Sequence, residues 1–221
     1  AVDLSAYVTE REGYDFTGWY LDAALTQPIT SLTLEADTTV YAGWRIRNPF
    51  VDVAEKDYFY DAVLWGVENG VVKGMDETHF EPETVCTRAQ ALTFLWRANG
   101  MPQPKTTTNP FVDVDASAYY YDAVLWGVEN GIVKGMDETH FEPDTACSRA
   151  HALTFLWRAK GMPQASGTTF ADVPANAYYA QAVAWGVENG IVKGMDETHF
   201  EPDTLCQRAH AVTFLWRAYA N

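Results

Sequence analysis

Three arginines stand at equivalent places in the chain, where a positive charge is unfavourable. Arg88, Arg149 and Arg208 each fall where the first turn of a helix is expected. A cation there faces the positive end of the helix dipole, at a cost of a few tenths of a kcal/mol. Two interpretations remain open. The arginine pairs with a carboxylate, such as Asp52 or an acid of a neighbouring repeat, or it joins free backbone N–H groups and a nearby hydroxyl in holding an anion.

Other residues recur beside these arginines and could complete an anion or sugar site. The hydroxyls belong to Thr87 and Ser148, whereas the third copy has Gln207. A lysine one loop away would give each repeat two cations for a carboxylate, and the three lysines are Lys73, Lys134 and Lys193. An aromatic ring beside a cation is a suitable platform for a sugar. The candidate rings are Tyr58, Tyr119 and Tyr178, whereas helical spacing places most tryptophans in the core.

The remaining reactive side chains indicate no metal site, cofactor or catalysis. The five histidines are His79, His140, His199, His151 and His210, and no repeat supplies closely spaced metal ligands. We expect these histidines to face solvent or pack against loops. The acidic loop lacks the ligand spacing of a calcium loop. The cysteines, Cys86, Cys147 and Cys206, are expected to be buried free thiols. No catalytic motif occurs, so we expect no enzyme activity.

Charge and hydropathy narrow the class of protein. The 221 residues carry 30 acids against 15 Lys and Arg, a formal charge of −15, which excludes a general nucleic-acid binder. At 48% hydrophobic residues the chain can bury a core. We expect no membrane span, because no apolar run approaches the ~18 residues that a span requires. The N-terminus has no signal-peptide pattern. Because residue 1 is Ala rather than Met, we expect the chain to be a processed or excised piece of a longer protein.

Blocks of sequence recur about every sixty residues, which indicates an internal repeat. WGVENG, GMDETHFEP and LTFLWRA, or VTFLWRA in the last copy, each occur three times. The repeats are expected at 48–109, 110–166 and 167–221, behind a separate module at 1–46.

Each repeat is expected to form a helix, a loop and a second helix. In the first repeat the helices span about Tyr58 to Asn69 and Arg88 to Ala98, with Gly70 left-handed after the first. Thr87 and Gln90 have capping-box spacing. Two such helices cannot enclose a core alone. We therefore expect a mainly α domain in which three helix-loop-helix repeats pack about a pseudo-threefold axis, with equivalent grooves between them.

The repeats resemble the S-layer homology domain. The resemblance is carried by Phe-x-Asp-Val, the step from Gly70 to Gly74, Phe-x-Pro and Thr-Arg-Ala-Gln at Thr87 to Gln90. It implies non-covalent anchoring to the cell wall through secondary cell-wall polysaccharide, typically a terminal pyruvylated N-acetylmannosamine, bound in inter-repeat grooves. The family's glutamate is replaced by Gln90, His151 and His210, so we expect the groove built on Gln207 to be the weakest.

The expected glycan-binding set combines the residues above with two motif positions of the family. It comprises Arg88, Arg149, Arg208, Thr87, Ser148, Gln207, Asp52, Asp113, Asp172, Tyr58, Tyr119, Tyr178, Lys73, Lys134, Lys193, Gly74, Gly135 and Gly194.

Residues 1–46 resemble part of an internalin-type B-repeat, a small β-grasp-like module. The resemblance rests on the run from Gly13 to Tyr20 and on Thr39 to Trp44, both of which alternate as strands do. We expect a stalk module without its own ligand. The whole chain is then expected to be monomeric and secreted, and to lie at the bacterial cell surface as a wall-anchoring module. The alternative is an adhesion or protein-interaction module that has lost glycan binding.

Overall fold

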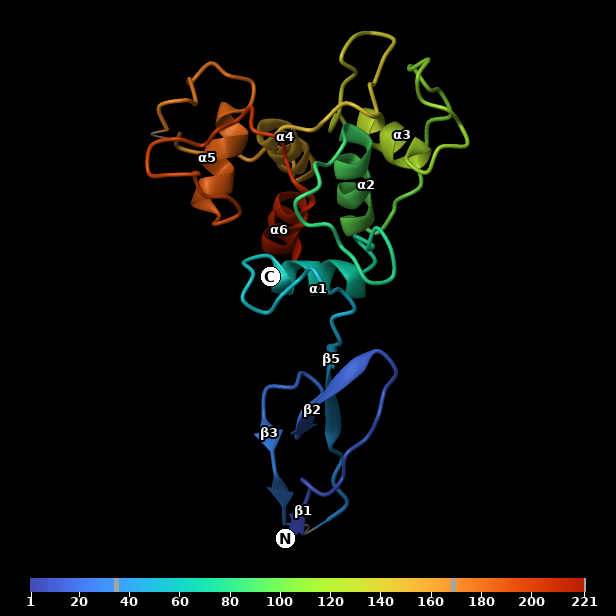
Figure 1. Ribbon diagram of the computed structural model, residues 1–221, viewed down its shortest axis with the longest axis vertical. Coiled ribbons are helices and arrows are strands. Elements are labelled where there is room, and N and C mark those ends of the chain that lie inside the picture. Colours follow the sequence, from blue (N-terminus) through green and yellow to red (C-terminus); the bar gives the residue numbers. More distant parts are fainter. Residues whose placement is uncertain (34–35, 168–169, 221) are drawn as a thin grey trace. The chain divides into compact units, whose positions relative to one another are not determined.

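The computed structural model describes residues 1–33, 36–167 and 170–220 (Figure 1). The chain divides into two compact units, Ala1–Pro49 and Phe50–Asn221. Each unit has its own internal packing and is described separately.

The first unit is a small antiparallel β module. Its strands are β1 (Val2–Asp3), β2 (Tyr14–Tyr20), β3 (Pro28–Ile29), β4 (Ser31–Leu32) and β5 (Tyr41–Ile46), arranged as a three-stranded sheet β3-β2-β5 and a pair β1-β4. The two predicted strand segments are therefore confirmed as β2 and β5. The Phe16 ring packs edge-on against Trp19 and Trp44, at centroid distances of 5.4 and 5.6 Å. These three rings hold the sheet together on one face.

The second unit is built from helices, six in the part of the chain that the structure describes. They are α1 (Tyr60–Glu68), α2 (Arg88–Ala98), α3 (Tyr121–Glu129), α4 (Arg149–Ala159), α5 (Ala180–Glu188) and α6 (Arg208–Tyr219). The expected bounds of α2 are confirmed, whereas α1 begins two residues later than expected. It does so because Tyr58 and Phe59 belong to a preceding turn, closed by the bond from the Tyr60 N–H to the Asp57 carbonyl at 3.0 Å. Gly70 ends α1 with φ +67°, the left-handed conformation expected of it.

The second helix of each repeat packs against the first helix of another repeat. The pairs are α2 with α3, α4 with α5 and α6 with α1, while α2, α4 and α6 also contact one another (Figure 1). The glycine of WGVENG makes this approach possible. A Cβ on Gly127 would come within 3.3 Å of Leu92 and within 2.9 Å of Val133. The position therefore keeps a glycine despite its low helix propensity.

Backbone hydrogen bonds join the three repeats in a closed cycle. The Cys147 N–H donates to the Cys86 carbonyl at 2.8 Å, Cys206 to Cys147 at 2.8 Å and Cys86 to Cys206 at 2.9 Å. All three side chains are free thiols and fully buried, as expected. Burial raises the pKa of Cys86 and of Cys147 to about 12, so these thiols stay protonated.

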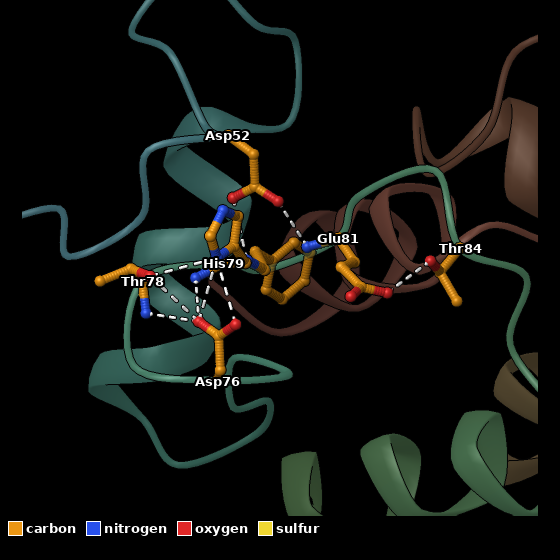
Figure 2. Close-up of polar contacts among 7 residues, drawn as sticks. Asp52, Asp76, Thr78, His79, Glu81 and Thr84 are labelled. Atoms are coloured by element: carbon orange, nitrogen blue, oxygen red, sulfur yellow. Dashed lines mark hydrogen bonds and ion pairs between the residues drawn. The ribbon is translucent and has the colours of Figure 1, made fainter.

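The loop between the two helices of each repeat is held by carboxylates (Figure 2). The two oxygens of Asp52 accept from the Phe80 N–H at 2.9 Å and the Glu81 N–H at 2.7 Å. Asp113 and Asp172 do the same in the other repeats. Glu81 has φ +55°, a conformation unfavourable for a side chain other than glycine, so the loop needs these bonds to keep its shape.

Removing one of these carboxylates should destabilise the second unit. We expect Asp113→Ala to lower the free energy of unfolding by about 1–3 kcal/mol, because two backbone N–H groups lose a charged acceptor. Asp115→Ala is the matched control, since Asp115 accepts only within an exposed turn at Ser117. Urea unfolding of both variants measures the difference. An Asp113→Ala variant as stable as Asp115→Ala would show that the Asp113 hydrogen bonds contribute nothing to the free energy of unfolding.

The outer part of each loop should show an acid transition of its own. Hydrogen bonds, the largest from the Thr139 N–H, lower the pKa of Asp137 from 3.8 to about 2, and the Thr198 N–H does the same for Asp196. Because the folded pKa is depressed, the stabilising contribution is present above pH 3.8 and is lost as the pH falls toward 2. Carboxyl-carbon NMR titration should give midpoints near 2. A midpoint near 4 at either residue would contradict these bonds.

Candidate functional site

The arginine at the start of each second helix reaches into the loop of another repeat. The Nε atom of Arg88 donates to the Phe141 carbonyl at 3.0 Å, and its Nη2 donates to the Lys134 carbonyl at 3.1 Å. Arg149 bonds in the same way to Phe200 and Lys193, and Arg208 to Phe80 and Lys73. Each arginine is only 3% exposed. Repeat 1 is thus tied to repeat 2, repeat 2 to repeat 3 and repeat 3 back to repeat 1.

The interpretation of these arginines as partners in salt bridges is wrong. Their printed acceptors are neutral carbonyls, and no ion pair of Arg88, Arg149 or Arg208 occurs within the described residues. Asp52, the carboxylate suggested as partner, is occupied by its own loop. The guanidinium of Arg88 also lies over the rings of Phe141 and Phe155, at 4.8 and 5.6 Å from their centroids. Carbonyl dipoles and ring faces together stabilise the buried charge.

The first two N–H groups of each second helix are not free, so that part of the anion-site interpretation is also wrong. The Arg88 N–H donates to the Thr145 carbonyl at 2.9 Å and the Ala89 N–H to the Pro143 carbonyl at 3.0 Å. The next donor, Gln90 N–H, is bound by the Thr87 hydroxyl at 3.2 Å. The helix N-termini at Arg149 and Arg208 meet the equivalent carbonyls. Each N-terminus is therefore capped by the neighbouring repeat instead of awaiting an anion.

The residues at the N-cap position have local roles. Thr87 and Gln90 form the predicted capping box, with the Thr87 N–H donating to the Gln90 Oε1 at 3.1 Å. The Ser148 hydroxyl accepts from the His151 N–H at 3.2 Å. Gln207 makes no side-chain cap bond.

A groove brings several of the predicted site residues together from all three repeats. It has a volume of about 150 Å³ and is called the Tyr58 groove below. Its lining comprises Tyr58 of repeat 1, Arg149 of repeat 2, and Lys193, Gly194, Met195, His210, Thr213, Phe214 and Arg217 of repeat 3. Four predicted residues, Tyr58, Arg149, Lys193 and Gly194, thus line one groove. Ser148 and Asp172 do not line it.

Equivalence of the repeats assigns the same residue types to the two other junctions between repeats. We call these the Tyr178 cluster, with Arg88, Lys134 and Gly135, and the Tyr119 cluster, with Arg208, Lys73 and Gly74. In the Tyr178 cluster, Arg88 donates to the Lys134 carbonyl. Burial lowers the pKa of Arg88, and Tyr178 is among the groups that oppose this shift. In the second, Arg208 binds the Lys73 carbonyl at 2.7 Å.

One guanidinium nitrogen of Arg149 remains available in the Tyr58 groove. Its Nε and Nη2 are used by carbonyls, whereas Nη1 has no hydrogen-bond partner among the described residues and is not buried from solvent. Lys193 is exposed, and the Tyr58 side chain is 56% exposed. The groove is therefore lined by three cations, Arg149, Lys193 and Arg217, and by an exposed aromatic ring, on a chain whose formal charge is −15.

Gly194 and its equivalents allow the loop to close. A Cβ on Gly74 would come within 2.6 Å of the Phe50 ring and 2.9 Å of the His79 carbonyl. Any side chain at this position would push apart the loop that carries Lys73 and Phe80.

Sequence analysis missed the roles of His210, Thr213 and Arg217 in the groove lining. The histidines were expected to face solvent or pack against loops, although His151 and His210 replace Gln90 at a helix position, which was an available signal. Arg217 lies in the last turn of α6, where a cation complements the helix dipole. Its Nη1 donates to the Ile191 carbonyl at 3.1 Å, after α5. Within the described residues no group of His, Cys, Asp or Glu is arranged to hold a metal ion.

The arginine ties predict a large effect on folding. We expect Arg149→Ala to lower the free energy of unfolding by about 2–4 kcal/mol, because two carbonyls lose a charged donor. The control is Lys193→Ala, whose exposed side chain should change stability by less than about 0.5 kcal/mol. Chemical denaturation measures both. An Arg149→Ala variant as stable as the control would show that the ties are not required for folding.

Comparison with known families agrees with this architecture. The S-layer homology domain matches residues 49–92, 110–153 and 169–212, and the Listeria-Bacteroides repeat domain matches residues 2–43. Among the described helices, none is both long and apolar enough to cross a membrane.

Several cell-surface proteins and some enzymes contain a similar region. The Surface-layer 125 kDa protein of Lysinibacillus sphaericus is 31% identical over 163 residues, 71% of this chain and 14% of that protein. The S-layer protein sap of Bacillus anthracis is 29% identical over 175 residues, which make up 75% of this chain and 20% of that protein. The Amylopullulanase of Thermoanaerobacterium thermosulfurigenes is 25% identical over 183 residues, which make up 80% of this chain and 10% of that protein. The chain thus spans a fifth or less of these relatives.

Both resemblances found in the sequence are confirmed by these matches. The chain belongs to the S-layer homology domain family, with three such domains following a Listeria-Bacteroides repeat domain.

Proposed function

We propose that the second unit anchors a longer exported protein to the bacterial cell wall by binding an anionic secondary cell-wall polysaccharide. The localisation at the bacterial cell surface is confirmed by the family. The observation that carries the proposal is the Tyr58 groove, where Arg149, Lys193 and Tyr58 from three repeats face one cavity. The ligand we propose ends in a pyruvylated N-acetylmannosamine, whose ketal supplies a carboxylate.

The groove offers the interactions that such a sugar requires. Arg149 Nη1 and the Lys193 ammonium would bind the carboxylate through charge-assisted hydrogen bonds. Tyr58 would pack its exposed ring against the pyranose. Asp172, Gly194 and Ser148, although predicted as binding residues, would act by shaping the loop and helix start that carry these contacts.

The cyclic bonds between repeats support a pseudo-threefold arrangement with three related sites. We propose that the Tyr58 groove, the Tyr178 cluster and the Tyr119 cluster each bind the repeating polymer weakly. Because a chain held at one site has a high local concentration at the next, several weak sites give firm attachment. A monomer with internal symmetry is sufficient for this mechanism.

The proposal also covers the role of the first unit and the absence of catalysis by this chain. We propose that residues 1–46 serve as a stalk with a β-grasp-like fold and no ligand of its own. We further propose that the chain itself catalyses nothing. The Amylopullulanase that it resembles is an enzyme by name, but the shared region covers only 10% of that protein.

Wall binding tests the proposal directly. The purified chain should sediment with native cell-wall sacculi and not with sacculi stripped of secondary polysaccharide by hydrofluoric acid. The double variant Tyr58→Ala/Tyr178→Ala should lose about fivefold or more in affinity, since ring stacking contributes about 0.5–1.5 kcal/mol per contact. Tyr7→Ala is the control, because Tyr7 is similarly exposed, 59% against 56% for Tyr58, and lies in the first unit.

Two results would contradict the proposal. Equal binding to stripped sacculi would point to peptidoglycan as the ligand. Absence of binding to either preparation would favour the protein-interaction alternative.

A further inference from the structure

The three junctions differ at one helix position in a way that changes what they offer a ligand. The residue three positions after the N-cap is Gln90 in the Tyr119 cluster, His151 in the Tyr178 cluster and His210 in the Tyr58 groove. Gln90 turns back to its own helix start, where its Oε1 accepts from the Thr87 N–H at 3.1 Å. Neither histidine makes this bond among the described residues.

The two imidazoles instead lie against the tyrosines of the sites. The ring centroid of His210 is 6.3 Å from that of Tyr58, and His151 is 5.8 Å from Tyr178, with an interplanar angle of 28° in both pairs. Each pair joins a side chain of the second helix to the turn before the first helix of another repeat. In each pair, the imidazole and the tyrosine ring are stacked and form one aromatic surface.

The surroundings favour the neutral form of both imidazoles. Nδ1 of His151 and of His210 is buried and has no hydrogen-bond partner among the described residues, so a proton there would be unpaired. Burial lowers the pKa of each histidine. Arg88 and Arg158 lower it further for His151, where Asp203 opposes them, and Arg149 lowers it further for His210. The neutral tautomer with its proton on Nε2 leaves Nδ1 bare and is therefore favoured.

The opposite edge of each ring is open. Nε2 of His151 and of His210 has no partner in the described part of the chain and is not among the buried unpartnered atoms. Arg149, whose charge acts on His210, lines the same groove. His210 and Arg149 thus line one groove, and Nε2 of the first and Nη1 of the second have no partner among the described residues.

A hydroxyl one turn further along distinguishes the same two sites. Thr93 in the Tyr119 cluster donates to the Ala89 carbonyl at 2.7 Å. Thr154 and Thr213 occupy the equivalent positions, and their Oγ1 atoms are buried without a partner among the described residues. Thr213 lines the Tyr58 groove. Two polar groups are thus unsatisfied in each histidine-containing site, whereas their counterparts at Gln90 and Thr93 are bonded internally.

We propose that His151 and His210 are glycan-contacting, specificity-determining residues, each donating its Nε2–H to the sugar beside the arginine's Nη1. The Tyr178 cluster and the Tyr58 groove then form a matched pair for a carboxylate-bearing sugar, and the Tyr119 cluster has a different selectivity. A neutral donor suits this ligand better than a glutamate, whose charge would repel the carboxylate. The proposal rests on the proposed glycan binding of these sites.

Substitution between repeats gives a conservative test. His151→Gln and His210→Gln install the residue that repeat 1 already uses, so both variants should fold. Calorimetric titration uses synthetic pyruvylated N-acetylmannosamine, with N-acetylmannosamine as the uncharged control. We expect each single variant to remove one tight site from the stoichiometry, and the double variant to weaken binding by about fivefold to tenfold, the worth of about one hydrogen bond per site. Gln90→His should add a site.

The wild-type protein supplies a readout that does not depend on variants. In ¹⁵N NMR of histidine-labelled protein, His151 and His210 should show the neutral Nε2–H tautomer, and their Nε2 signals should shift when the pyruvylated sugar binds. His79, His140 and His199 are internal controls, because they lie in the loops outside the groove lining.

The outcomes separate this inference from the function on which it rests. Failure of the wild-type chain to bind either the pyruvylated sugar or native sacculi would overturn the proposed function. Wild-type binding that persists undiminished in the folded double variant, with unmoved Nε2 signals, would overturn the histidine contacts and leave the function standing.

Discussion

Burial of one arginine per repeat inside a neighbouring loop is the constraint on which the second unit depends. A guanidinium that is 3% exposed is tolerated only where enough acceptors surround it. In each repeat the acceptors are two carbonyls of another repeat and the faces of two phenylalanine rings. Because the partner always lies elsewhere in the cycle, no repeat can satisfy its own arginine. The three repeats must therefore fold together.

The loops are shaped to provide those acceptors. Asp52 fixes the two N–H groups around Phe80, and the Phe80 carbonyl is then presented to Arg208 at 2.9 Å. The left-handed backbone at Glu81 and the tight space at Gly74 belong to the same construction. Folding and the proposed ligand binding share this framework, since Arg149, which ties two repeats together, also lines the groove. A loss of binding in an arginine variant has to be judged against its loss of stability.

Much of the fold followed from local sequence, whereas the chemistry of the site did not. The bounds of α2, the left-handed Gly70, the Thr87 capping box and the strands β2 and β5 are all determined by neighbouring residues, so periodicity and turn preferences revealed them. The acceptors of Arg88 are 46 and 53 residues away. They are main-chain atoms without any residue type of their own, and no motif could identify them. The same applies to the carbonyls that occupy the helix N-termini, which made the open anion site expected there wrong.

The bonds from Arg208 back to Phe80 and Lys73 have a mechanical consequence for the anchoring role proposed above. In an open row of repeats, tension at one end would peel the units apart in sequence, each giving way alone. Here the last repeat is fastened to the first, so the unit has no free terminal repeat from which separation could begin. A pulling force that enters at Phe50 reaches a closed ring and is shared between two interfaces at once. Resistance of the second unit to separation of its repeats under tension is thereby built into the connectivity of the chain.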